Sequence, residues 1–165
     1  MKRLILMRHA KSDWADPSLP DHDRPLNKRG RRAATALGHW LRAAGLHPDQ
    51  ALCSSAARTQ ETCARLALPF DPERHPALYL AEAPDMLRTL RAAQGDTVLM
   101  IGHNPGIAEL AAHLVATPPA HGRFEDYPTG ATLVAEFDID TWRDLQPGTG
   151  RAQHFVIPRE LTDSP

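Results

Sequence analysis

Leu4-Ile5-Leu6-Met7-Arg8-His9 opens the chain with a short apolar run that ends in an arginine and a histidine. The run predicts a strand from Arg3 to Met7, because four successive apolar residues bounded by charge are typical of a short buried strand. The Arg-His pair then stands at the carboxyl end of this strand. In an open α/β sheet, ligands bind at that edge.

Two later strand-like runs end in a similar way, so this edge of the sheet collects several functional side chains. Ala51-Leu52-Cys53 leads into Ser54-Ser55-Ala56-Ala57-Arg58, and Thr97 to Ile101 leads into Gly102-His103-Asn104-Pro105-Gly106. We therefore expect two guanidinium groups and two imidazoles to meet there, with no carboxylate among them. This set describes a site for a phosphoryl group that a histidine attacks. Its members are Arg8, His9, Arg58 and His103.

The position of Arg58 supports an anion site. The sequence predicts a helix from about Ala56 to Leu66, capped by Ser54 or Ser55, so that Arg58 falls in the first turn. A cation is disfavoured at that positive end of the helix dipole unless an anion sits beside it. The alternative for Arg58 is a surface ion pair with Glu61, and for each histidine a hydrogen bond to a loop.

The remaining pattern alternates between strands and helices. Asn27 predicts the N-cap of a helix that runs through Ala44 and stops at Gly45, with an apolar face of Ala33, Ala36, Leu37, Trp40, Leu41 and Ala44. Further helices are expected over 84–93 and 105–115, the second capped by Asn104, and Ala77 to Tyr79 is strand-like. Residues 132–137 and 153–157 alternate like antiparallel strands. The chain is therefore expected to be one domain over residues 1–165, a three-layer α/β/α sandwich with a mostly parallel sheet and antiparallel C-terminal strands.

The connection from Lys11 to Leu26 is much longer than the usual four to six residues or so. It is rich in polar residues and proline, and it carries Trp14. Long loops in compact domains are often functional. We expect this loop to frame the entry of the substrate.

Composition excludes several classes of protein. The formal net charge of −1 and the pI near 6.7 give no broad footprint for nucleic acid or an anionic membrane. The first apolar run is too short for a signal peptide, and no segment approaches the roughly 20 apolar residues of a membrane span. We expect a cytoplasmic protein whose two cysteines, Cys53 and Cys63, are core residues. The histidines lack the spacing of metal ligands, so no metal is expected.

These stretches resemble the signature of the histidine phosphatase (phosphoglycerate-mutase-like) superfamily, and more specifically its SixA-type phosphohistidine phosphatase branch. The resemblance spans nearly the whole chain. It is carried by residues 8–14 (RHAKSDW), 23–30 (DRPLNKRG), 54–59 (SSAART), 102–105 (GHNP), 128–131 (PTGA) and 158–161 (PREL).

The resemblance implies that His9 is the nucleophile and forms a phosphohistidine intermediate that water hydrolyses. Arg8, Arg58 and His103 would bind the phosphoryl oxygens together with Ser12, and the arginines would take the part that Mg²⁺ plays in other phosphoryl-transfer enzymes. No cofactor is implied. The two guanidinium groups should lower the pKa of His9 and keep it neutral for attack.

Two positions depart from the mutases of this superfamily. Ala15 stands where those relatives carry an asparagine that contacts phosphate, and Leu80 falls near where they supply a glutamate as general acid. Glu82 is a nearby but weak candidate for that acid. An imidazole leaves without such help more easily than an alkoxide, which favours phosphohistidine as the substrate. The chain also lacks the long insertion that covers a small substrate in mutases, so the expected partner is a protein that carries phosphohistidine.

Two other functions remain open from the sequence. The same four residues could hydrolyse small phosphate esters, or the chain could be a non-catalytic module that holds phosphate on His9. A metallohydrolase ranks last. The sequence favours a monomer that acts in signalling or phosphotransfer.

Overall fold

Six strands form one sheet with the order β3-β2-β4-β1-β5-β6. The computed structural model describes residues 1–162. The first four strands in this order are parallel to one another, and β5 and β6 add in antiparallel orientation, as predicted. The strands are β1 (Lys2–Arg8), β2 (Gln50–Ser54), β3 (Glu73–His75), β4 (Thr97–Gly102), β5 (Thr132–Phe137) and β6 (Arg151–Val156).

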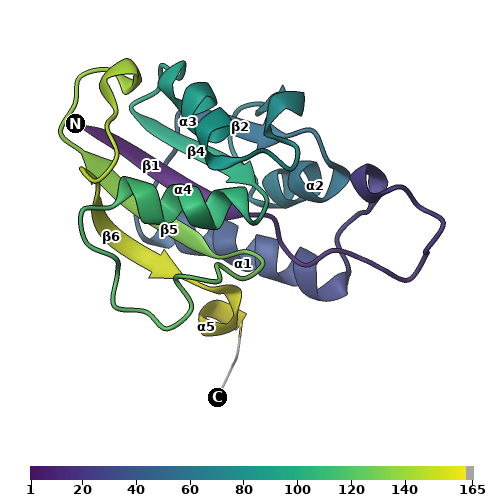
Figure 1. Ribbon diagram of the computed structural model, residues 1–165. Helices are drawn as coiled ribbons and strands as arrows, with labels where there is room; N and C mark the ends of the chain where they lie inside the picture. The colour runs from purple at the N-terminus through teal and green to yellow at the C-terminus, as the bar shows by residue number, and fades with distance from the viewer. Residues whose placement is uncertain (163–165) are drawn as a thin grey trace.

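Helices cover both faces of this sheet, which confirms the predicted α/β/α sandwich (Figure 1). The α-helices are α1 (Lys28–Ala43), α2 (Ala57–Arg65), α3 (Ala83–Arg91), α4 (Gly106–Leu114) and α5 (Pro158–Thr162). Three short 3₁₀ helices are η1 (Asp21–Asp23), η2 (Pro76–Leu78) and η3 (Trp142–Asp144). The loop that carries η1 projects from the body of the protein at the right of Figure 1.

The central strands are apolar because both of their faces are buried. Leu4 and Leu6 of β1 pack into the core beneath α3 and α4, whereas Ile5 and Met7 pack into the core beneath α1 and α2. Strand alternation sends successive side chains to opposite faces. The continuous apolar run that opened the chain is thus explained by a strand that serves two cores.

The predicted ends of α1 are confirmed. The Asn27 side chain accepts a hydrogen bond from the Gly30 N–H at 2.8 Å, and Gly45 follows the helix with a φ of 70°. The predicted apolar face is wrong at Ala44, which is the C-cap and lies exposed. Gly30, Ala34 and Gly38 are also buried. Ala34 packs with Ala10 and Leu26, and a Cβ at Gly38 would stand 2.7 Å from the carbonyl oxygen of Leu66, the C-cap of α2.

Two predicted helix starts are shifted. Ala56 is the N-cap of α2, and neither Ser54 nor Ser55 caps that helix through its side chain. Pro105 is the N-cap of α4, because the Asn104 side chain donates instead to the carbonyl groups of Asp126 and Tyr127 in the loop after α4. Ser54, Ser55 and Asn104 thus form hydrogen bonds with distant residues instead of capping the helices that follow them.

The strand-like reading of Ala77 to Tyr79 is wrong. These residues lie in and just after η2, and the strand at this edge is the polar segment Glu73–His75, which pairs with β2. Pro76 cannot donate a backbone hydrogen bond, so the hydrogen-bond ladder between β2 and β3 ends before it.

Cys53 and Cys63 are buried and form no disulfide, as expected. Within residues 1–162, no helix is long and apolar enough to cross a membrane.

Gly30 allows the first turn of α1 to lie directly on the chain that follows β1. A Cβ at this position would stand 2.1 Å from the carbonyl oxygen of Lys11. Substitution of a helical glycine by alanine normally stabilises a helix by about 1 kcal/mol. Here the added methyl group would clash with the backbone of Lys11, which cannot move without disturbing the packing of α1. Gly30→Ala should therefore lower the free energy of unfolding by about 2–3 kcal/mol in urea denaturation.

Gly122→Ala is the matched control, since no heavy atom beyond the two adjacent residues lies within 4 Å of its Cβ position. This variant should change the free energy of unfolding by less than about 0.5 kcal/mol. A Gly30→Ala protein as stable as the wild type would contradict the close packing described.

Candidate active site

The four predicted catalytic residues lie together at the carboxyl edge of the sheet. Arg8 ends β1, His9 follows it, Arg58 lies in the first turn of α2, and His103 follows β4. All four line one pocket of about 230 Å³ together with Ser12. The rings of His9 and His103 are 5.3 Å apart between centroids. The structure therefore assembles the whole predicted set, Ser12 included.

His9 presents one defined nitrogen for attack. Its Nδ1 lies 2.7 Å from the carbonyl oxygen of Ala10, which can only accept, so Nδ1 carries the proton and Nε2 carries the lone pair. Burial, opposed by that hydrogen bond and assisted by the charges of Arg8 and Arg58, lowers the pKa of His9 to about 4. The predicted direction is right, but burial contributes more than the arginines. At neutral pH the ring is a free base.

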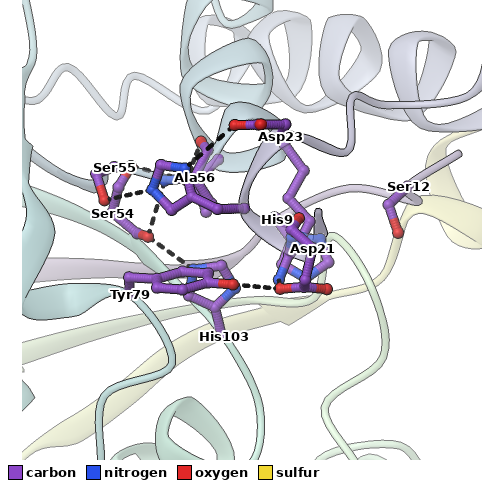
Figure 2. Close-up of polar contacts among 12 residues, drawn as sticks. His9, Ser12, Asp21, Asp23, Ser54, Ser55, Ala56, Tyr79 and His103 are labelled. Carbon is purple, nitrogen blue, oxygen red and sulfur yellow. Dashed lines mark hydrogen bonds and ion pairs between the residues drawn. The ribbon is translucent and has the colours of Figure 1, made fainter. Parts of the chain in front are cut away.

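His103 is held by the serine that ends β2. Its Nε2 lies 2.7 Å from Oγ of Ser54 (Figure 2). The buried Nδ1 has no protein partner within the described residues, so it is the ring nitrogen left for a bound ligand. Burial and the neighbouring His9 lower the pKa of His103 to about 3. With Ser54 donating to Nε2, the neutral ring offers its Nδ1–H to an oxygen atom.

The two arginines bring positive charge into the same buried space. Burial, followed by the charge of Arg58, lowers the pKa of Arg8 from its ordinary value. The Arg58 side chain is only 6% exposed. The two positive charges repel each other, and an anion bound between them would offset this repulsion. The pair is thus arranged to bind a group with negative charge on several oxygens.

A carboxylate also belongs to the site, contrary to the expectation of none. Asp21 in η1 accepts from Arg58 Nη2 at 3.0 Å, and its backbone carbonyl accepts from Nη1 at 2.8 Å. The hydroxyl of Tyr79 donates to the same carboxylate (Figure 2). The Tyr79 hydrogen bond and then Arg58 hold the pKa of Asp21 below its usual range, so the group is ionised. The predicted alternative of an Arg58–Glu61 pair is wrong, since Glu61 bonds Arg65 and the backbone of Leu26.

Asp21 and Tyr79 were missed because nothing local marks them. Asp21 lies 37 residues before Arg58 and Tyr79 lies 58 residues after Asp21. The length of the Lys11–Leu26 loop was the only indication that it reaches the site. Asp21 accepts from both terminal nitrogens of Arg58 and so fixes the guanidinium group, which is a positioning role.

The rim of the pocket is formed by Trp14 and Leu80. Trp14 is 66% exposed, donates from Nε1 to Ser12 Oγ at 3.0 Å, and is stacked by the Arg24 guanidinium at 4.1 Å. Leu80 is 53% exposed and has a φ of 50°, a strained conformation for leucine. The remaining lining residues, none of them predicted as site residues, are Lys11, Asn104 and Thr129.

In the part of the chain that the structure describes, no aspartate or glutamate lines this pocket. Glu82 is exposed at the N-cap of α3 and does not line the pocket. No group of three or more His, Cys, Asp or Glu side chains suited to a metal ion is found in residues 1–162. The pocket therefore offers a neutral nitrogen nucleophile, two guanidinium groups, a neutral imidazole, the amine of Lys11 and the hydroxyls of Ser12 and Thr129.

Comparison with known proteins agrees with this geometry. Residues 4–82 match the family model of the histidine phosphatase superfamily, branch 1. An uncharacterized protein of Mycobacterium tuberculosis is 34% identical, with 93% of this chain and the whole of that protein aligned.

Two solved structures are similar over nearly their full length, and both are putative phosphohistidine phosphatases SixA. The protein of Nakamurella multipartitia is 32% identical with a TM-score of 0.84, covering 95% of this chain and 96% of the other. That of Agrobacterium tumefaciens is 25% identical with a TM-score of 0.78, covering 95% and 98%.

The chain belongs to the histidine phosphatase superfamily, and the resemblance to its SixA type is confirmed. Its general activity is accordingly that of a histidine-based phosphatase.

Proposed function

We propose that this protein removes the phosphoryl group from phosphohistidine in a protein partner, with His9 as the nucleophile. The observation that carries the proposal is that no carboxylic acid of residues 1–162 lines the pocket. Leu80 occupies the wall near where the resemblance places a glutamate in mutases. A phosphate ester needs a proton on its leaving oxygen, whereas an imidazole is a good leaving group without one from the enzyme.

In the proposed reaction, Nε2 of His9 attacks phosphorus in line with the departing imidazole. The P–N bond of the substrate breaks as a new P–N bond forms to His9, and a proton taken from solvent by the other nitrogen of the substrate ring lets the imidazole leave as a neutral molecule. Arg8, Arg58, His103 and Ser12 bind the oxygens of the transferred group and stabilise its charge. Water then attacks the phosphohistidine on the enzyme, and inorganic phosphate and neutral His9 are released.

The open rim favours a macromolecular substrate. Trp14 and Leu80 are two of the three large hydrophobic side chains that are exposed within residues 1–162, and both line this pocket. Exposed apolar side chains around a polar site are typical of contact with another protein. The two SixA neighbours, which carry phosphohistidine phosphatase in their names, agree with this substrate class. A role in signalling or phosphotransfer in the cytoplasm stays a prediction, as does the monomeric state.

Hydrolysis of a small phosphate ester is the second candidate, because the same four residues could serve it. Its weakness is the missing carboxylic acid: the Asp21 carboxyl, which contacts Arg58, has a lowered pKa and is ionised. A binding module without turnover is the third candidate. The neutral, oriented Nε2 of His9 argues against it, because that atom is ready to react.

Release of phosphate from a phosphohistidine-bearing protein, with EDTA present throughout, tests the proposal. Wild type should turn over many equivalents, and His9→Ala should lose turnover because no other nitrogen occupies that position. His113→Ala, an exposed histidine on α4, is the control and should keep wild-type rates. Hydrolysis of small esters alone would favour the second candidate, and no turnover of either would favour the binding module.

Leu80 allows a direct test of the missing acid. A Leu80→Glu protein should gain at least about tenfold in kcat/KM on an alkyl phosphate ester, since general acid catalysis contributes about 10²–10⁴-fold where it is well placed. Leu80→Gln has the same size without the proton and should show no such gain. If both substitutions changed the steady-state rate of ester hydrolysis equally, the claim that a general acid is missing at position 80 would be contradicted.

A further inference from the structure

A second pocket, about 480 Å³ in volume, lies beside the catalytic pocket of about 230 Å³. Lys11 and Thr129 line both, so the two are continuous. Arg29, Arg123 and Arg159 also line the larger pocket, and among residues 1–162 no aspartate or glutamate lines it. We call this larger pocket the basic groove. It gathers four cationic residues in a protein whose formal net charge is −1.

One wall of the basic groove is fixed to the chain just after His9. The Lys11 carbonyl accepts from the Asn27 N–H at 3.0 Å, immediately before α1. Gly30 lets the first turn of α1 rest against that same carbonyl, since a Cβ there would clash with it at 2.1 Å. Arg29, in that turn, is thereby held near Lys11.

The other wall is fixed to His9 itself. The Gly130 N–H donates to the His9 carbonyl at 2.9 Å, directly after Thr129. Pro158 at the start of α5 packs onto Gly130, where a Cβ would meet its ring at 2.4 Å. A group bound in the basic groove would therefore stand at a set distance from the attacking nitrogen.

Two of the four cationic residues of the groove have no acidic partner among residues 1–162. Lys11 and Arg29 make no ion pair with any residue in 1–162, whereas Arg123 pairs with Asp126 at 2.8 Å. The first turn of α1 contains no acid although it holds Lys28, Arg29 and Arg31. Cations at the positive end of a helix dipole are unfavourable. An anion bound beside them would offset that cost.

Glu160 is the acidic residue of α5. Its Oε1 accepts from the Ile157 N–H at 2.9 Å and lies 3.2 Å from His121 Nε2. The carboxylate thus caps the start of α5, and it does not line the groove.

We propose that the basic groove binds carboxylates of an acidic segment next to the phosphohistidine of the partner protein. This inference rests on the proposed function. All four cationic residues are exposed, and they come from four separate stretches of the chain. Sites for small ligands bury a few converging polar groups, which this groove lacks. Exposed, spread cations instead suit the charged surface of a protein and its electrostatic steering.

Two phosphohistidine peptides of one sequence test the inference, one with Asp and Glu beside the phosphohistidine and one with Asn and Gln there. Wild type should prefer the acidic peptide by about tenfold in kcat/KM at low salt, and added salt should shrink the preference. Arg29→Glu should remove or reverse the preference, because it places a carboxylate in the groove.

Arg143→Glu is the matched control, with the same change in charge at the opposite end of the sheet. Arg143 is exposed in η3, whose Trp142 donates to the Gly95 carbonyl just before β4 begins. This variant should keep the preference for the acidic peptide. Equal kcat/KM on both peptides in the wild type, or equal losses in the two variants, would overturn the inference and leave the proposed function standing.

Two further results would also overturn it. No turnover of either peptide would refute the proposed function and this inference with it. If Arg29→Glu impaired a small bisphosphate ester more than the acidic peptide, the groove would be a subsite for a second phosphate.

Discussion

The parallel pairing of β4 with both β1 and β2 is the constraint on which the site depends. Its register sets Arg8 opposite Gly102 and Cys53 opposite Ile101, so that three strands end at the same level. The His9 N–H then donates to the Gly102 carbonyl at 3.2 Å, which places His9 beside His103. A shift of one residue in either pairing would turn these side chains to the other face of the sheet. The apolar cores on both faces prevent such a shift.

Within that frame, burial sets the chemistry of the pocket. His9 is 6% exposed and His103 2%, and burial is the largest cause of the lowered pKa of each. Both rings are therefore neutral where two guanidinium groups remain charged. A neutral nucleophile beside fixed positive charge is what attack on an anionic phosphoryl group requires. Asp21 tempers the charge of Arg58 while it orients the guanidinium group.

The sequence predicted the parts of the site that depend on strand ends, and it failed where distant segments meet. Short apolar runs locate β1, β2 and β4, and whatever follows them must stand at the same edge of a parallel sheet. Asp21 and Tyr79 reach Arg58 through the tertiary fold, which no local pattern encodes. The polar strand β3 was missed because Glu73-Arg74-His75 contains no apolar residue. Asn104 was misread as a cap because it bonds the loop before β5 instead of α4.

Trapping the phosphorylated enzyme tests the central claim, that Nε2 of His9 accepts the phosphoryl group, most directly. The protein would be mixed with a phosphohistidine substrate, quenched rapidly in alkali, digested, and mapped by mass spectrometry. The account predicts a phosphoryl adduct on His9 that forms and decays at rates compatible with steady-state turnover. Turnover with the adduct on another residue, or with no adduct on His9 at any time, would contradict it.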